Sequence, residues 1–93
     1  KSLAQWIVAN AGFALLAFAL PLTAGERGIV LMGGIMVLAM ECVNTAIERV
    51  VDDIGLQKRD LAQHAKDCGS AAVAVTAVAV GVAWICILGG LLI

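Results

Sequence analysis

Charge is scarce in this chain, and the scarcity excludes one class of partner. Of the 93 residues, 6 are basic and 7 are acidic, and the formal net charge is −1. A protein that binds nucleic acid needs an excess of positive charge to meet the phosphate backbone. The composition therefore excludes nucleic acid as a partner.

The sequence also lacks the residue patterns of common metal and nucleotide sites. Its three cysteines, Cys42, Cys68 and Cys86, are odd in number and form no CxxC pair, so neither a disulfide framework nor a zinc site is indicated. There is no G-x-x-x-x-G-K-[ST] loop and no G-x-G-x-x-G loop to hold phosphate. If a nucleotide binds here, carboxylates, a metal ion and scattered basic groups must hold it.

Apolar residues, by contrast, are abundant. They make up 62% of the chain, and a soluble protein of this size would leave much of that surface in water. Lipid is the solvent that suits such a composition. We therefore expect an all-α integral membrane protein whose residues 1–93 form a single membrane domain.

Three apolar segments predict three transmembrane helices, at about 3–22, 28–51 and 70–93. Each has roughly 20 to 24 residues, which at about 1.5 Å per residue is enough to cross a hydrocarbon core. Basic residues gather at the second connection rather than the first. By the positive-inside rule, the N-terminus and the polar segment 53–69 face the cytoplasm, and this segment lies at the membrane interface. Gly55 is expected to end or bend the second helix.

A row of polar residues interrupts the second apolar segment. Glu41, Asn44, Glu48 and Asp52 follow one another at spacings of three, four and four, so they lie within roughly 80° of one another on a helix, with Thr45 on the same face. A carboxylate at membrane depth costs about 2.5 kcal/mol or more. Such a row therefore indicates either a site or a specific structural contact.

Three interpretations of this row remain open from the residues alone. It could be a buried polar network between helices, a pathway for protons or cations, or the site of a membrane-embedded enzyme. In an enzyme, the deeper Glu41 would suit a general base for a hydroxyl, and the shallower Glu48 would suit a ligand for Mg²⁺. Asn44 could orient a neighbour by donating and accepting at once, and Asp52 could add charge to a metal or a basic partner. Glu41 and Glu48 are roughly 10 Å apart along the axis, too far to share a metal unaided.

Lys66 and Asp67 form a second candidate, just before the third apolar segment. Asp67 is close to Ser70 and is expected to be the N-cap or a first-turn acid of the third helix. Lys66 is placed to meet a phosphate at the interface. Lys58 and Arg59 in the same polar segment would meet headgroups or a phosphorylated ligand.

Two motifs carry a resemblance to a known family. The run E-C-V-N-T-A-I-E at 41–48, followed by V-V-D at 50–52, and the run A-K-D-C-G-S-A-A-V at 65–73 resemble the prokaryotic diacylglycerol kinase family. Its members show E-x-x-N-[ST]-A-I-E-x-x-V-D and A-K-D-x-[GA]-[SA]-[AG]-A-V at this separation. Two motifs with matching spacing, inside three hydrophobic segments, make the resemblance specific.

The resemblance implies a small kinase of the bacterial inner membrane that transfers the γ-phosphate of MgATP to a lipid hydroxyl. Such enzymes are homotrimeric helical bundles of three-helix subunits, with active sites shared between neighbouring subunits. By position in the motifs, Glu41 is the implied general base and Glu48 the implied ligand of Mg²⁺ near the ATP phosphates, with Asn44 and Asp52 completing the polar site. The other implied contacts are Lys58, Arg59, Lys66 and Asp67 at the nucleotide, and Arg27, Ser70 and Trp84 at the lipid.

One departure from the family concerns the N-terminal part. Members usually carry an amphipathic surface helix there and an acidic metal ligand near the start of the first span, whereas no acidic residue precedes Glu26 here. We expect the chain as written either to be a fragment or to lack that helix, and the missing ligand either to weaken activity or to leave this chain alone inactive.

The acceptor follows from the second motif. The run K-D-C-G-S-A-A at 66–72 is more similar to the diacylglycerol branch of the family than to the undecaprenol branch, which reads K-D-x-A-A-G-A. The resemblance therefore favours diacylglycerol, with phosphatidic acid as product. The alternatives are an undecaprenol kinase, a proton- or cation-conducting membrane subunit, and a non-catalytic subunit whose acidic face pairs with a partner.

Overall fold

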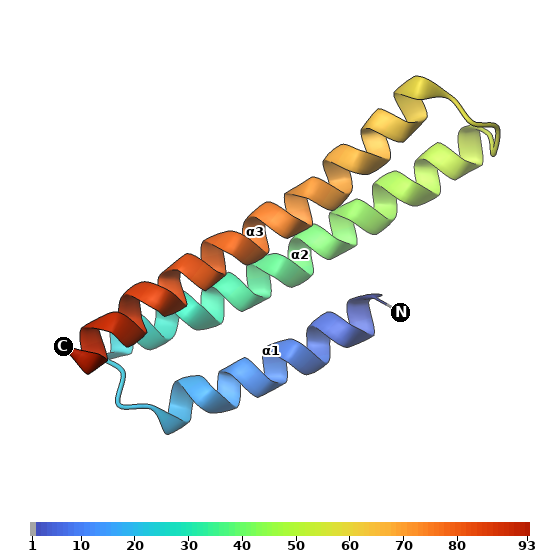
Figure 1. The fold of residues 1–93 in the computed structure, drawn as a ribbon. Coiled ribbons are helices and arrows are strands. Elements are labelled where there is room, and N and C mark those ends of the chain that lie inside the picture. The colour runs from blue at the N-terminus through green and yellow to red at the C-terminus, as the bar shows by residue number, and fades with distance from the viewer. Residues whose placement is uncertain (1) are drawn as a thin grey trace.

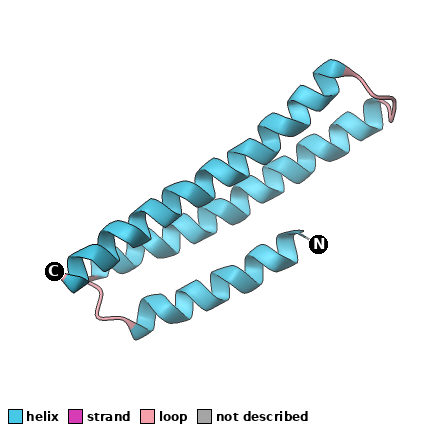
Figure 2. Ribbon diagram, viewed as in Figure 1, coloured by secondary structure: helices cyan, strands magenta, loops and turns pink. Residues whose placement is uncertain are grey.

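The computed structural model describes residues 2–93, and over these residues the chain forms three α-helices. Helix α1 spans Ser2–Ala19, α2 spans Ala24–Ile54 and α3 spans Asp60–Leu92 (Figure 1). Short connections join them (Figure 2). Helices α2 and α3 form a long antiparallel pair, and α1 runs back beside the N-terminal half of α2, so that α2 packs against both. The predicted all-α fold of three helices is confirmed.

The two long helices exceed the thickness of a bilayer core. At about 1.5 Å per residue, the 31 residues of α2 and the 33 residues of α3 extend roughly 46 and 50 Å, against about 30 Å of hydrocarbon. Both are long and apolar enough to cross a membrane, whereas the apolar stretch of α1, Leu3–Ala19, is shorter. A helix pair of this length is longer than the hydrocarbon core is thick. The third span, predicted at 3–22, stays a prediction.

Helix α2 begins at a capping box that its sequence encodes. The Thr23 hydroxyl accepts from the backbone N–H of Glu26 at 3.1 Å, and the Thr23 N–H donates to the Glu26 carboxylate at 2.9 Å. Arg27 then reaches back to α1, where its guanidinium donates to the carbonyls of Ala17 at 2.9 Å and Leu20 at 3.3 Å. The Ala17 carbonyl is in the last turn of α1, where carbonyls lack a partner within the helix, and the Leu20 carbonyl directly follows the helix and also accepts from the Leu22 N–H at 2.8 Å. The turn between α1 and α2 is thus held by side chains that satisfy both helix ends.

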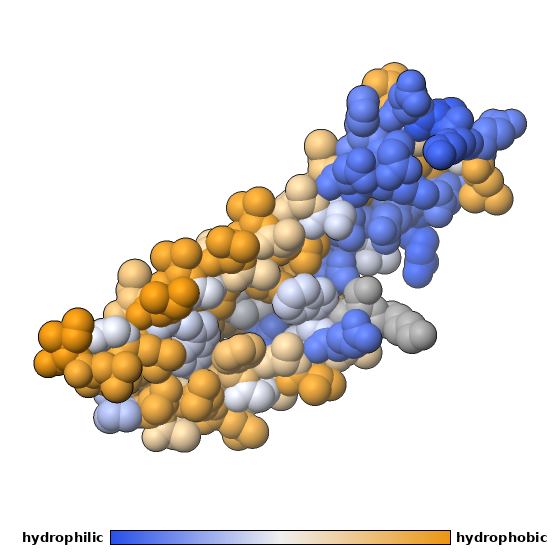
Figure 3. Space-filling model, viewed as in Figure 1, coloured by the Kyte–Doolittle hydropathy of each residue, from blue (hydrophilic) through white to orange (hydrophobic). Residues whose placement is uncertain are grey.

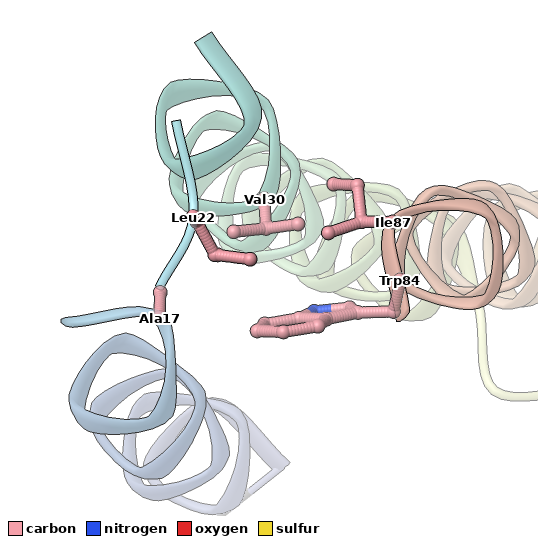
Figure 4. Close-up of a cluster of buried hydrophobic side chains, with 5 residues drawn as sticks. All are labelled: Ala17, Leu22, Val30, Trp84 and Ile87. Carbon is pink, nitrogen blue, oxygen red and sulfur yellow. The ribbon is translucent and has the colours of Figure 1, made fainter. Parts of the chain in front are cut away.

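An apolar cluster fills the space beside this turn (Figure 4). In the close-up, the Trp84 indole extends from α3 toward α1 and lies beneath Val30 of α2. The ring of Phe13, on α1, is 5.7 Å from the Trp84 ring. Side chains of all three helices therefore meet at this end of the molecule. The buried members of the cluster are Ala17, Leu22, Val30, Trp84 and Ile87.

The polar segment predicted at 53–69 is mostly helical, which corrects one expectation. Helix α2 continues to Ile54, and its capping residue Gly55 donates its N–H to the Val51 carbonyl at 3.3 Å. Helix α3 begins at Asp60, with Arg59 as its N-cap residue. The prediction that Asp67 is an N-cap or first-turn acid was wrong. Hydropathy marks where lipid is the solvent, whereas a helix continues through polar residues wherever its backbone bonds can form.

Candidate active site

The deepest polar group of the molecule is a carboxylate paired with a carboxamide. Glu41 is 5% exposed and Asn44 is 9% exposed, and both are presented by α2 toward the interior. The Asn44 Nδ2 donates to Glu41 Oε1 at 3.4 Å. Because the two residues are three apart on one helix, their side chains project from the same face. The pair therefore places an oriented carboxylate at depth.

Glu41 and Asn44 open into a polar hollow between α2 and the start of α1. This acidic hollow has a volume of about 490 Å³. The prediction that the acidic row shares one face is confirmed for the three residues Glu41, Asn44 and Glu48, which line the same space. Glu48 is exposed, in contrast to the buried Glu41. The other residues that line the acidic hollow are Leu3, Cys42, Thr45 and Arg49.

A second hollow lies where α2 and α3 connect. This basic hollow, of about 220 Å³, is lined by Lys58, Arg59 and Lys66 together with Asp52. Lys66 Nζ is 2.6 Å from Asp52 Oδ1, and the two side chains are 35% and 47% exposed. The expectation that Asp52 meets a basic partner is confirmed. The contact joins the two sequence motifs, because Asp52 ends the first and Lys66 belongs to the second.

Figure 3 shows how strongly the polar residues segregate. Hydrophilic residues gather at the end formed by the α2–α3 connection, while the remaining length of the visible face is largely hydrophobic. The candidate residues Glu48, Asp52, Lys58 and Lys66 belong to this polar part of the sequence. On this face, therefore, the polar residues are concentrated at one end of the molecule.

Arg59 already has partners within the chain. Its Nη2 donates to the carbonyls of Val51 at 3.3 Å and Gly55 at 3.4 Å, which lie at the C-terminal end of α2. A cation at a helix C-terminus is favourable because the free carbonyls there carry partial negative charge. The structure thus uses Arg59 to cap α2, while the neighbouring Lys58 is exposed.

The remaining candidates of the second motif lie on α3. Asp67 is exposed, and its carboxylate accepts from Gln63 Nε2, one turn earlier, at 2.8 Å. Ser70 is also exposed. Both follow Lys66 within about one turn of α3, but of these three residues Lys66 is the one that lines the basic hollow.

Two residues predicted at the lipid site lie at the opposite end of the molecule. Arg27 is in the first turn of α2 and holds the end of α1, with its guanidinium 5.2 Å from the Phe18 ring. Trp84 belongs to the apolar cluster in Figure 4. Arg27 precedes Glu41 by about four turns of α2, or roughly 20 Å. The structure does not bring these two residues together with the Glu41–Asn44 pair.

The two motifs, their order and the contact between them agree with a comparison over nearly the whole chain. The family model described as prokaryotic diacylglycerol kinase matches residues 1–88. The chain belongs to the prokaryotic diacylglycerol kinase family. The predicted resemblance is confirmed, and the family makes this chain a membrane protein related to ATP-dependent phosphotransferases.

Three curated relatives named diacylglycerol kinase support the family membership. The protein of Pseudomonas aeruginosa is 36% identical over 86 residues, which cover 92% of this chain and 70% of the relative. That of Haemophilus influenzae is 43% identical over 58 residues, covering 62% and 46%. That of Escherichia coli K12 is 40% identical over 62 residues, covering 67% and 50%. The matched regions thus span about half the length of the last two relatives.

For a member of this diacylglycerol kinase family, the donor set fits one particular kind of metal binding. Among residues 2–93, no three acidic, histidine or cysteine side chains gather as a ready metal cage. Mg²⁺ is usually held by one or two carboxylates together with substrate phosphates and water. A single exposed carboxylate such as Glu48, facing an open polar hollow, fits that mode.

Sequence reasoning missed two residues of this site. Arg49 lines the acidic hollow beside Glu48, although it stands at a variable position of the diacylglycerol kinase motif. Gly69 is buried on α3 and faces Asn44. Its place inside the second motif was the available signal, but a glycine suggests no chemistry until its neighbour is known.

Proposed function

We propose that this chain is a lipid kinase that transfers the γ-phosphate of MgATP to the hydroxyl of diacylglycerol and gives phosphatidic acid. One observation carries the assignment of the site. A buried carboxylate, held by a carboxamide, opens into a polar hollow at the end of the molecule where the basic residues gather. A lipid hydroxyl and a nucleotide phosphate need these two environments side by side.

Glu41 is the proposed general base. The lipid O–H bond breaks as its oxygen attacks the γ-phosphorus, the proton passes to the Glu41 carboxylate, and the bond from the γ-phosphorus to the ADP oxygen breaks. Burial of Glu41 suits a lipid acceptor, whose hydroxyl cannot travel far into water. The hydrogen bond from Asn44 orients one carboxylate oxygen and leaves the other free for the hydroxyl.

Glu48 is the proposed ligand of Mg²⁺, which fits its exposure on the acidic hollow. When bound, the ion spreads the negative charge of the phosphates during transfer. Glu48 itself fixes where the phosphates enter, about two turns of α2 from the base. This spacing leaves room for the transferred group between the two carboxylates.

Lys66 and Lys58 are the proposed cationic contacts of the nucleotide, with Asp52, Arg59 and Asp67 as supports of that region. An exposed ion pair such as Lys66–Asp52 contributes at most about 1 kcal/mol. Lys66 therefore loses little by turning one of its three N–H donors to a phosphate. Arg59, which caps α2, would act by holding the connection in shape.

The proposed lipid contacts are Glu41 and Ser70, near the polar end. Arg27 and Trp84, which lie outside both motifs, remain lipid contacts implied by the family resemblance, but their contacts with α1 and the apolar cluster favour a structural use. A headgroup that reaches Glu41 cannot reach Arg27 at the same time, because about four helical turns separate them. Undecaprenol is the alternative acceptor within the family.

The proposed membrane arrangement has three spans, with the N-terminus and the polar end in the cytoplasm of the bacterial inner membrane. The α2–α3 pair runs along the length of the molecule, which is 53 Å. This length lets the basic hollow reach the aqueous side while Glu41 stays near the boundary between water and hydrocarbon. We also propose a homotrimer with shared sites. The many exposed apolar side chains along the helices, such as Val8, Leu15 and Ile85, are compatible with both lipid and neighbouring subunits.

The test is transfer of labelled γ-phosphate from MgATP to lipid in mixed micelles, with diacylglycerol and undecaprenol compared. Label on diacylglycerol is expected, and Glu41→Gln should lower it at least roughly 100-fold, as for loss of a general base. Glu26→Gln is the matched control, because it changes a carboxylate in the capping box far from the site. Label confined to undecaprenol would change the acceptor. Proton or cation flux in liposomes without ATP, and no label on either lipid, would refute the kinase.

A further inference from the structure

Gly69 and Asn44 make the closest contact between the two motifs. A Cβ atom built on Gly69 would lie 2.5 Å from Asn44 Oδ1 and 3.4 Å from Ile47 Cδ1. Contacts of this kind below 3.0 Å are essentially never adopted by real Cβ atoms. Any residue larger than glycine at position 69 must therefore displace the Asn44 carboxamide. Gly69 itself is buried on α3.

The other end of the same carboxamide holds the proposed base. Asn44 Nδ2 donates to Glu41 Oε1 at 3.4 Å, a long hydrogen bond that a small rotation would break. Asn44 Oδ1 is buried and has no hydrogen-bond partner among the described residues. No strong bond on the α3 side therefore anchors the amide. Its orientation depends on the shape of the space that Gly69 leaves.

We infer that Gly69 is a positioning residue for phosphoryl transfer. It acts through Asn44, which it holds with the Nδ2 donor toward Glu41, and so it sets the orientation of the base from the neighbouring helix. The inference rests on the proposed function of Glu41.

A second contact in the molecule has the same form without the carboxylate. The Oδ1 of Asn10, on α1, lies against Gly34 of α2, where a Cβ would also overlap it. The Nδ2 of Asn10 donates to the backbone carbonyl of Trp6 at 3.1 Å. Gly34→Ala should thus disturb helix packing while leaving the orientation of the Glu41 carboxylate unchanged. It is a matched comparison for Gly69.

The experiment compares Gly69→Ala, Asn44→Ala and the double variant in the full-length protein in mixed micelles. Gly69→Ala should lower kcat roughly 10- to 100-fold, the range expected for a misplaced catalytic group, with KM for ATP nearly unchanged. The double variant should be no slower than Asn44→Ala alone, because the displaced carboxamide is gone. Gly34→Ala should lower stability but not kcat. Gly81→Ala, whose added Cβ has no atom within 4 Å, should change neither.

A second readout does not depend on turnover. The chain has two asparagines, Asn10 and Asn44, so their side-chain amide signals can be assigned by NMR with labelled asparagine and the Asn44→Ala variant. Gly69→Ala should shift the Asn44 signal, and Gly34→Ala should shift the Asn10 signal. If wild type transfers no phosphate but the Asn44 signal shifts, the proposed function fails and the contact stands.

Three outcomes would overturn the inference. The first is that Gly69→Ala and Asn44→Ala lower kcat by factors that multiply in the double variant. The second is an Asn44 signal unchanged by Gly69→Ala. The third concerns a Gly69→Ala variant that does not fold. The double variant should then fold as well as Asn44→Ala, because the overlap is removed, and its failure to fold would overturn the inference.

Discussion

The two ends of α2 use the same kinds of polar residue for opposite purposes. At the helix corner, formed by residues 17–30, the acid Glu26 and the base Arg27 are bonded to backbone groups within the chain. At the polar end, residues 41–70, Glu48 is exposed, Lys66 and Asp52 form an ion pair that water still reaches, and Asn44 Oδ1 has no partner among the described residues. Satisfied groups fix a structure, whereas unsatisfied groups can bind a substrate. In a membrane protein, polar residues without partners inside the chain are therefore better candidates for a catalytic or binding role than those already bonded to the backbone.

The largest expected effect is at the apolar side of the helix corner. Trp84→Ala should lower the free energy of unfolding by about 3–5 kcal/mol, because the indole joins α3 to α1 and α2 in the buried cluster. Titration with a denaturing detergent, followed by loss of helicity, would measure it. The folded fraction should keep its kcat. Ile85→Ala, which alters an exposed neighbour, should change little, and equal effects of both would refute a specific role for the cluster.

The next effect should appear at the polar end and in catalysis alone. Glu48→Gln should lower kcat roughly 100-fold, which is about 2.7 kcal/mol of transition-state stabilisation. Raising the Mg²⁺ concentration should restore part of the rate, and stability should stay near that of wild type. A kcat for Glu48→Gln equal to that of the corner variant Glu26→Gln would remove Glu48 from the metal site.

Substitution of Arg27 tests whether the helix corner has a purely structural role. Arg27→Ala should lower the free energy of unfolding by about 1.5–3 kcal/mol, the usual range for hydrogen bonds from a charged group, because the Ala17 carbonyl loses its side-chain donor and the Leu20 carbonyl keeps only the Leu22 N–H. The KM for lipid should not change. A raised KM with unchanged stability would instead support the lipid contact predicted from the sequence.

The smallest effect should come from the exposed ion pair. Asp52→Asn should change the free energy of unfolding by less than about 1 kcal/mol, since both side chains remain in water. The difference from wild type should shrink further at high salt. A change as large as that of Arg27→Ala would mean that the Lys66–Asp52 contact holds α2 and α3 together.

Much of the site was predictable because helical periodicity is local. The spacing of Glu41, Asn44 and Glu48 was enough to put them on one face, and the structure places them in one hollow. The start of α3 was not predictable from hydropathy, because the residues from Asp60 onward are polar yet helical. The capping role of Arg59 was not predictable either, since its hydrogen bonds join residues on opposite sides of the turn between α2 and α3.

Four properties follow from the order of the amino acids alone: the membrane character, the number of helices, the acidic row and the family. These depend on composition and on relations within one helix, which are set by about 100° of rotation per residue. The tertiary structure alone decided which residues meet across helices: Asn44 with Gly69, Lys66 with Asp52, and Arg27 with the end of α1. Those contacts depend on the axial register in which α2 packs against α1 and α3. That register is a property of packed surfaces, which no spacing along the chain records.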